Sequence, residues 1–258
     1  MSANLLYSLA GFGVGTLVGL TGVGGGSLMT PILVLVFNFH PASAVGTDLL
    51  YACITKSVGS FVHNWKRSVD WSIVGWLALG SLPAAIVALG LLAAAGPPSA
   101  DIVDPIKVTL GVMLLLTGVA LLAKNRILSW SRSHGDDRNP VTTRNLTVLL
   151  GAVVGAAVSI TSVGAGAIGA TALLVLYPRK PIARIVGSDV AHAVPLTFVA
   201  GIGHWWLGTV DFALLGALLV GSVPGIALGS MLASHVRESI LRPILASILI
   251  IVAINLIA

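Results

Sequence analysis

The chain has 258 residues and a formal net charge of +5; 56% of its residues are hydrophobic, only 9% are charged, and its mean hydropathy is +1.01. Soluble domains are about half apolar and about one quarter charged, so this composition excludes a water-soluble globular enzyme. Long runs of Leu, Ile, Val, Ala and Gly show no alternation with polar residues, which favours helices over a transmembrane β-barrel. The sequence therefore predicts an all-α polytopic membrane protein.

Eight apolar segments follow one another along the chain, separated by polar or turn-forming residues. They cover residues 5–37, 47–62, 71–95, 106–123, 146–177, 188–203, 212–233 and 240–258. The first and the fifth are too long for a single helix crossing of about 20 residues, yet two arms of about 15 residues would each reach only roughly 22 Å of a ~30 Å core. We therefore expect two bent hairpins, re-entrant or barely spanning, with turns at 21–26 and 161–166. The bundle would then have eight spans plus two re-entrant segments, or ten short helices.

The basic residues are distributed unevenly over the predicted loops. Twelve of the fourteen Lys and Arg lie in the loops 63–71, 124–145, 178–187 and 234–242, whereas the loops 38–46, 96–105 and 204–211 contain none. Short loops rich in Lys and Arg stay in the cytoplasm, which places the first four loops inside and both chain ends outside. Because these charges are spread over four short loops, they indicate topology and not a nucleic-acid partner. We expect a multi-pass protein of the bacterial inner membrane.

The second half of the chain repeats the first. The matched pairs include Gly11 and Gly151, Gly24 and Gly164, Asp48 and Asp189, His63 and His204, Asp70 and Asp211, Ser81 and Ser222, and Pro83 and Pro224. Equivalent loops have different charge, because 63–71 is basic and 204–211 contains no basic residue. We therefore predict two inverted repeats, 1–123 and 146–258, each a hairpin plus three helices, joined by a cytoplasmic linker, 124–145. Inverted repeats are typical of secondary transporters, which bind substrate near the middle of the membrane.

The repeated residues also carry a family resemblance. The motifs, in chain order, are Thr21-Gly-Val-Gly-Gly-Gly-Ser27 followed by Pro31, Gly46-Thr-Asp48, Thr55-Lys56, His63 with Val69-Asp70-Trp71, Gly187-Ser-Asp189, and His204 with Gly208-Thr-Val-Asp211. Over essentially the whole chain this order resembles the sulfite exporter TauE/SafE family, also called TSUP. The resemblance implies movement of small sulfur-containing anions, such as sulfite or organosulfonates, across a bacterial inner membrane. The second tip, Thr161-Ser-Val-Gly-Ala-Gly166, lacks the triple glycine, so the two tips need not contribute equally.

Candidate substrate-binding residues lie at the tips of both predicted hairpins. A glycine-rich turn exposes backbone amides, and the helix that follows it directs a partial positive charge towards an oxyanion. The candidates at the tips are Thr21, Gly22, Gly24, Gly25, Gly26, Ser27, Thr161, Ser162, Gly164 and Gly166. Close helix packing is the alternative use of these glycines. It is the use that we expect at six positions with four-residue spacing, namely Gly11, Gly15, Gly19, Gly151, Gly155 and Ser159.

Lys56 is a further candidate, because it lies near the middle of the segment 47–62. A cation there costs at least ~2.5 kcal/mol on insertion scales, so it needs a partner or a water-filled cavity. It could bind the anion directly, form an ion pair with Asp48 or Asp189, or extend to the membrane surface. Its equivalent in the second repeat is Thr197, so the predicted site contains a single cation.

Asp48 and Asp189 follow Thr47 and Ser188 at the predicted starts of two helices. We expect these carboxylates to cap the helix N-termini, and coupling of transport to protons is the alternative. His192 follows Asp189 by one turn and could titrate near neutral pH. We favour a neutral histidine that makes hydrogen bonds at this position.

His63 and His204 lie, with Asp70 and Asp211, at matching ends of predicted segments on opposite sides of the membrane. We expect these residues to tie loops to helix ends, and a gate is the alternative. The remaining histidines show no spacing typical of metal ligands. We therefore expect no metal, no cofactor and no catalytic residue.

These features together predict a secondary transporter, and an exporter in particular, of small sulfur-containing anions. A membrane potential that is negative inside favours outward movement of an anion by ~2.3 kcal/mol per charge per 100 mV, so export needs no further coupling. An anion channel of the same fold is one alternative, and a structural or enzymatic subunit of a membrane complex is another. The expected partners are the small anion and the lipid bilayer, and assembly into a homo-oligomer is left open.

Overall fold

The computed structural model describes residues 3–21, 26–65, 67–96, 100–134, 139–232 and 238–257. These residues form helices and no strands, which confirms the all-α class. The helices are α1 (Ala3–Thr21), α2 (Gly26–Leu35), α3 (Pro41–Trp65), α4 (Trp71–Ala94), α5 (Ala100–His134), α6 (Pro140–Thr161), α7 (Ala167–Leu176), α8 (Ile182–Trp206), α9 (Phe212–Leu232) and α10 (Glu238–Ile257). Within the described chain, α4, α6, α8, α9 and the part of α5 from Asp104 to Lys124 are long and apolar enough to cross a membrane.

Both predicted hairpins are present, but their arms are unequal. The first arms, α1 and α6, have 19 and 22 residues, whereas the second arms, α2 and α7, have 10 residues each. The expectation of two arms of similar length was therefore wrong. At 1.5 Å per residue, α6 is about 33 Å long and α7 only about 15 Å, so the short arm covers about half of a membrane core. Each short helix consequently begins well inside the bundle.

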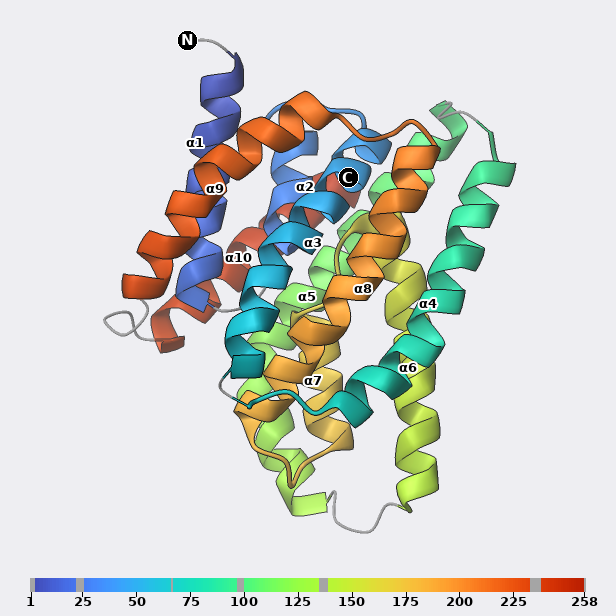
Figure 1. Cartoon of the computed structure of the whole chain (residues 1–258), viewed down its shortest axis with the longest axis vertical. Helices are drawn as coiled ribbons and strands as arrows, with labels where there is room; N and C mark the ends of the chain where they lie inside the picture. The colour runs from blue at the N-terminus through green and yellow to red at the C-terminus, as the bar shows by residue number, and fades with distance from the viewer. Residues whose placement is uncertain are drawn as a thin grey trace.

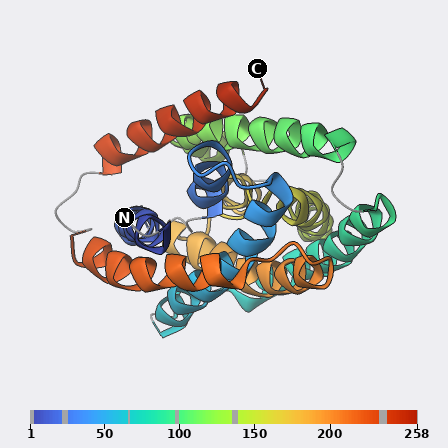
Figure 2. The ribbon, with the colours of Figure 1, turned by 90° about the horizontal axis from the view of Figure 1, so that it is seen from above.

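The helices are arranged in layers around the short arms. Figure 2 shows α5 and α10 side by side along one face, α8 and α9 along the opposite face, and α2 between them. The other short helix, α7, contacts α5, α6 and α8. The predicted linker 124–145 is largely helical in its described part, because α5 continues to His134 and α6 begins at Pro140.

The contacts between helices follow an exchange pattern. The helix α1 packs against α9 in the same way that α6 packs against α4, and two further pairs are formed by α3 with α8 and by α5 with α10. The first five helices can be matched in order with the last five, α1 with α6 and so on to α5 with α10. Under this matching the pair α1–α9 corresponds to α6–α4, and the pairs α3–α8 and α5–α10 each correspond to themselves. Two interlocked five-helix repeats would produce this pattern, and the division of the chain into 1–123 and 146–258 stays a prediction.

Glycines allow the closest helix pairs to form. A Cβ atom on Gly15 of α1 would lie 2.6 Å from the carbonyl oxygen of Ser222 in α9, and one on Gly155 of α6 would collide with the backbone of Ser81 in α4. Small residues of this kind let helix backbones approach within a membrane, where van der Waals packing replaces the hydrophobic effect. The packing role predicted for Gly15 and Gly155 is thus confirmed.

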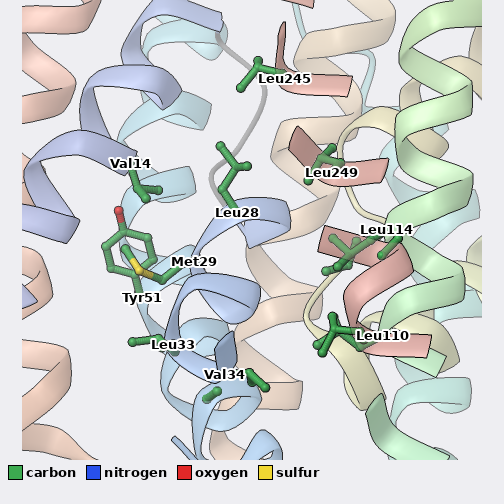
Figure 3. Packing of buried hydrophobic residues seen from close by; sticks show 14 of the residues in the cluster. Val14, Leu28, Met29, Leu33, Val34, Tyr51, Leu110, Leu114, Leu245 and Leu249 are labelled. Atoms are coloured by element: carbon green, nitrogen blue, oxygen red, sulfur yellow. The ribbon is translucent and has the colours of Figure 1, made fainter. Parts of the chain in front are cut away.

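The largest cluster of buried apolar side chains holds the first short arm in place. Figure 3 shows Met29 and Leu33 of α2 among Val14 of α1, Tyr51 of α3 and Leu110 of α5. Met29, Leu33 and Leu110 are fully buried. Such packing fixes the position of α2, and with it the residues that α2 presents to α3.

Candidate functional site

The central helices α3 and α8 begin earlier than the sequence suggested. Asp48 and Asp189 each lie seven residues after the first residue of their helix, Pro41 or Ile182, so neither carboxylate caps a helix N-terminus. The capping prediction was wrong because it placed the helix starts at the apolar runs. Proline is well tolerated in the first turn of a helix, and α3 begins at one.

Thr47 and Ser188 form equivalent bonds across the two halves of the chain. The backbone N–H of Asp211 donates to Thr47 Oγ1 (3.0 Å), and that of Asp70 donates to Ser188 Oγ (2.8 Å). The hydroxyl groups therefore hold the chain just before α9 and α4, not the start of their own helices. The neighbouring Gly46 leaves room for this approach, because a Cβ there would lie 2.9 Å from the Thr209 hydroxyl.

Asp70 and Asp211 cap α4 and α9, as expected from their position at the helix ends. Asp70 Oδ1 accepts from the N–H of Ser72 (3.2 Å), and Asp211 Oδ1 accepts from that of Leu214 (2.9 Å). Asp70 also forms an ion pair with Lys180. Partial burial alone would raise the pKa of Asp70, but the hydrogen bond and charge of Lys180 outweigh it and hold this pKa below its usual value.

The two interior carboxylates each contact a short hairpin arm. Thr30 of α2 donates its hydroxyl hydrogen to Asp48 Oδ2 at 2.5 Å. Asp189 Oδ1 packs against Gly169 of α7, where a Cβ would collide with it. Asp48 is 0% exposed and Asp189 is 2% exposed, so both carboxylates lie in the interior of the bundle.

Lys56 joins this centre to the second hairpin tip. Its Nζ donates to the carbonyl oxygen of Ala165 (3.0 Å), and its side chain is only 4% exposed. Asp189 and Asp48 are both close enough to attract its charge. Lys56 therefore does not extend to the surface of the molecule, and its cation, the two carboxylates and a hairpin tip come together.

Three buried polar atoms near this centre have no hydrogen-bond partner among the described residues. They are Asp48 Oδ1, Ser162 Oγ and His192 Nδ1. Nearly all buried polar atoms in proteins are hydrogen-bonded, so each of these requires an explanation. A small polar solute or water could satisfy them.

The second tip is a sharp turn. Ser162 has a left-handed conformation (φ 59°) at the end of α6, and Gly164 and Gly166 have φ values of 121° and 133°, which favour glycine. The Thr161 hydroxyl is used within the turn, because it donates to Ala157 O (2.7 Å) and accepts from the N–H of Val163 (3.2 Å). Of these predicted tip residues, only Ser162 keeps a side-chain group without a partner in the described chain.

Part of the first tip lies outside the described residues. Gly22, Gly24 and Gly25 belong to that part. Thr21 ends α1, and Gly26 and Ser27 begin α2, with only their backbone described. His63 lies in α3, and its side chain is likewise outside the description.

Two polar pairs that sequence reasoning missed flank the centre. Tyr51 Oη lies 2.7 Å from Ser222 Oγ, and His192 Nε2 lies 2.7 Å from Ser81 Oγ. Tyr51 and His192 occupy equivalent positions of the two repeats, as do Ser81 and Ser222. The match of the two serines was visible in the sequence, but nothing in it identified their partners.

His204 connects three segments away from the centre. Its Nε2–H donates to the carbonyl oxygen of Ser159 in α6 (2.8 Å), and its Nδ1 lies 2.9 Å from the Thr209 hydroxyl. Both ring nitrogens thus have partners, which fits a residue that ties a loop to a helix end. A gating role for His204 stays a prediction.

Two open pockets lie at opposite ends of the central helices. One, of about 510 Å³, is lined by Asp70, Trp76, Arg144 and Lys180, and the Arg144 guanidinium lies 5.0 Å from the centre of the Trp76 ring. The other, of about 370 Å³, is lined by Ala42, Ile160, His204 and Thr209, among others. Figure 1 shows α3 and α8 running between these two ends. The buried side chains of Asp48, Lys56 and Asp189, which α3 and α8 carry, therefore lie between the two pockets. In the described residues, no group of three His, Cys, Asp or Glu side chains could hold a metal ion.

Comparison with known proteins gives consistent matches. The model of the family described as "Sulfite exporter TauE/SafE" matches residues 7–256. A probable membrane transporter protein, YjnA, of Bacillus subtilis is 38% identical over 258 residues, which cover 100% of both chains. Another, YdhB of the same organism, is 24% identical over 92% of this chain and 94% of its own length. A third, MJ0441 of Methanocaldococcus jannaschii, is 23% identical over 95% of this chain and 91% of its own length. No solved structure matches the chain.

Proposed function

Because the chain belongs to the sulfite exporter TauE/SafE family, we propose that this multi-pass membrane protein is a secondary transporter that exports small sulfur-containing anions, such as sulfite or organosulfonates. We place it in a bacterial inner membrane with both chain ends outside, following the distribution of Lys and Arg. The names of the relatives support a membrane transporter. The anion and the outward direction are part of the proposal.

One observation carries the proposed site: Lys56 is buried beside a hairpin tip in the interior of the bundle. Its Nζ contacts the carbonyl oxygen of Ala165, and the unpartnered hydroxyl of Ser162 belongs to the same tip. A cation and free hydrogen-bond donors are what a small oxyanion requires. The start of α7 adds the partial positive charge of a helix N-terminus.

The closed centre favours a carrier over a channel. Asp48, Lys56 and Asp189 are all less than 5% exposed, so a solute reaches them only after the bundle changes shape. A carrier is expected to show flux that saturates with anion concentration and exchanges labelled for unlabelled anion. Flux that rises linearly with concentration would instead support a channel.

An enzymatic or structural subunit is the weaker alternative. The relatives that the chain matches over at least nine tenths of its length are named as membrane transporters. A function as a transporter and not an enzyme therefore agrees best with the family.

Purified protein provides the direct test. Sulfite, sulfate, thiosulfate, sulfoacetate and taurine would be screened for protection against heat, and the protecting anions would be followed across proteoliposome membranes. A bound ligand at 100 times its Kd stabilises a protein by about 2.7 kcal/mol. We expect Lys56→Gln to abolish this protection because the variant removes the buried cation.

Lys107→Gln is the matched control, because Lys107 lines a different, open pocket near the start of α5. It should keep the protection by the anion. Equal protection of Lys56→Gln and the native protein would remove Lys56 from the site. Absence of both protection and flux with every anion would contradict the proposed function.

A further inference from the structure

The membrane interior contains an excess of negative charge. Among the described residues, the buried Asp, Glu, Lys and Arg side chains are Asp48, Lys56 and Asp189. If all three are ionised, their sum is −1. An entering anion would therefore meet a site whose net charge repels it, in an environment of low dielectric constant.

In the part of the chain that the structure describes, no other buried Asp, Glu, Lys or Arg side chain changes this sum. The short arms α2 and α7 and the tip segments 21–27 and 161–166 contain no titratable residue. On α3 the neighbouring titratable groups are Tyr51 and Cys53, and on α8 they are His192 and His204. Tyr51 is bonded to Ser222, and His192 is bonded to Ser81 of α4.

Helix dipoles offset part of the negative charge. Both α2 and α7 begin in the interior, and each helix N-terminus is equivalent to roughly +0.5 of an elementary charge. Two such ends can balance a net charge of about −1. No positive charge then remains to balance the additional negative charge of a bound anion.

The two carboxylates differ in their hydrogen bonds. Asp48 accepts the Thr30 hydroxyl at 2.5 Å, a bond that stabilises an ionised carboxylate. Asp189 receives no hydrogen bond from the described residues, and Lys56 is its stabilising neighbour. Asp48 keeps its bond to Thr30 when Lys56 turns to another partner, whereas Asp189 has no such donor among the described residues. An anion that binds Lys56 therefore competes first with Asp189.

We propose that Asp189 takes up one proton whenever an anion binds beside Lys56, so that one proton crosses the membrane with each anion. This inference rests on the proposed anion site. Without anion, ionised Asp189 balances Lys56. With a monovalent anion bound, the neutral acid leaves the Lys56 cation to the anion, and the net charge of the site stays at −1. The proton enters from the side on which the site is open and leaves with the anion on the other side.

This coupling determines how the membrane potential acts. A monovalent anion with one proton carries no net charge, so its movement follows the pH and anion gradients alone. A divalent anion with one proton still carries one negative charge, and a potential that is negative inside favours its export by ~2.3 kcal/mol per 100 mV.

The test uses anions of strong acids, methanesulfonate (monovalent) and thiosulfate (divalent), which bind no proton near neutral pH. Native protein in proteoliposomes should acidify the lumen, recorded with a trapped pH dye, as methanesulfonate enters. A gradient of one pH unit should accumulate this anion about tenfold, and an imposed potassium diffusion potential should not. Flux of either anion without proton movement, or methanesulfonate flux driven by the potential, would overturn the coupling, whereas the potential should drive thiosulfate flux.

Binding measurements assign the proton to its residue. Calorimetry in two buffers of different ionisation enthalpy should show about one proton taken up per anion by the native protein and by Asp48→Asn. Asp189→Asn should bind anion without proton uptake and with an affinity that no longer changes about tenfold per pH unit. Loss of proton uptake in Asp48→Asn, but not in Asp189→Asn, would overturn the assignment.

A control variant and the experiments on native protein separate loss of coupling from loss of folding. Asp104→Asn, an exposed residue at the start of α5, should behave as the native protein. If Asp189→Asn does not fold, the native experiments with pH and potential still decide the coupling. Absence of any anion flux would refute the proposed function, whereas anion flux without protons would refute only this inference.

Discussion

At the scale of single residues, hydrogen bonds connect the two halves of the chain in equivalent pairs. Tyr51 of the first half contacts Ser222 of the second, and His192 of the second contacts Ser81 of the first. All four side chains are 0–1% exposed. These bonds therefore fix how α3 and α8 sit against α9 and α4.

Ser222→Ala tests the first of these bonds. Buried hydrogen bonds between membrane helices contribute on average ~0.6 kcal/mol and at most ~1.7 kcal/mol in double-mutant cycles. We expect a coupling energy in this range between Ser222→Ala and Tyr51→Phe, measured by unfolding in detergent.

Ser57→Ala serves as the comparison, because Ser57 is exposed and bonds only within its own helix, to Cys53 O. It should leave the stability nearly unchanged and show no coupling to Tyr51→Phe. Additive effects of Ser222→Ala and Tyr51→Phe would contradict a contribution of this bond.

The sequence predicted some of the central residues and not their partners. Lys56, Asp48 and Asp189 could be singled out because a charge inside an apolar segment is costly. The carbonyl oxygen of Ala165 could not, since a backbone atom leaves no signal in residue type. The capping error at Asp48 arose because a helix start was placed at the change from polar to apolar residues, whereas α3 includes polar residues in its buried first turns.

At the scale of helices, each long hairpin arm is packed against a helix of the other half. The pairs α1–α9 and α4–α6 depend on glycines that allow backbone contact. The sequence predicted these glycines from their four-residue spacing. It did not predict that the hairpin arms differ in length, because hydropathy is nearly uniform along both arms and only the position of the turn determines where each arm ends.

Two glycines of α1 give a matched test of this packing. A Cβ on Gly15 would lie 2.6 Å from the backbone of Ser222, whereas one on Gly13 would contact nothing within 4 Å. Gly15→Leu should force α1 away from α9 and cost at least the ~1–3 kcal/mol typical of overpacking. Gly13→Leu should be tolerated.

Thermal unfolding and gel filtration of the two purified variants would measure the difference. Similar melting temperatures for Gly15→Leu and Gly13→Leu would show that α1 does not depend on close contact with α9.

At the scale of the whole molecule, the two halves make equivalent contacts with each other, whereas the buried charges between them are not equivalent. The bonds from Thr47 to Asp211 and from Ser188 to Asp70 are equivalent, as are the contacts of Asp48 with α2 and of Asp189 with α7. Lys56 has Thr197 as its counterpart, so the positive charge occurs once. Repetition in the sequence led to the prediction of two repeats, which stays a prediction, while the pairing of distant helices required the folded chain.

The predicted inverted orientation can be tested by labelling single cysteines in whole cells. In a Cys53→Ser background, His40→Cys lies in a loop predicted outside and Thr142→Cys in the segment predicted inside; both positions are exposed. An impermeant thiol reagent should modify His40→Cys in intact cells and Thr142→Cys only after the membrane is broken, because the basic loops stay inside.

The measured quantity is the amount of reagent attached to the purified protein. Labelling in broken cells shows that each cysteine can react with the reagent. Modification of both cysteines in intact cells, or of Thr142→Cys alone, would contradict the predicted topology.

The two equivalent bonds of Ser188 and Thr47 lie at opposite ends of the bundle, where the chain passes into α4 and into α9 (Figure 1). Each half of the molecule thus contributes a hydroxyl acceptor to the bond at one end and a backbone N–H donor to the bond at the other. An opening of the bundle at one end would break only the bond at that end, so the contact at the opposite end would be unaffected.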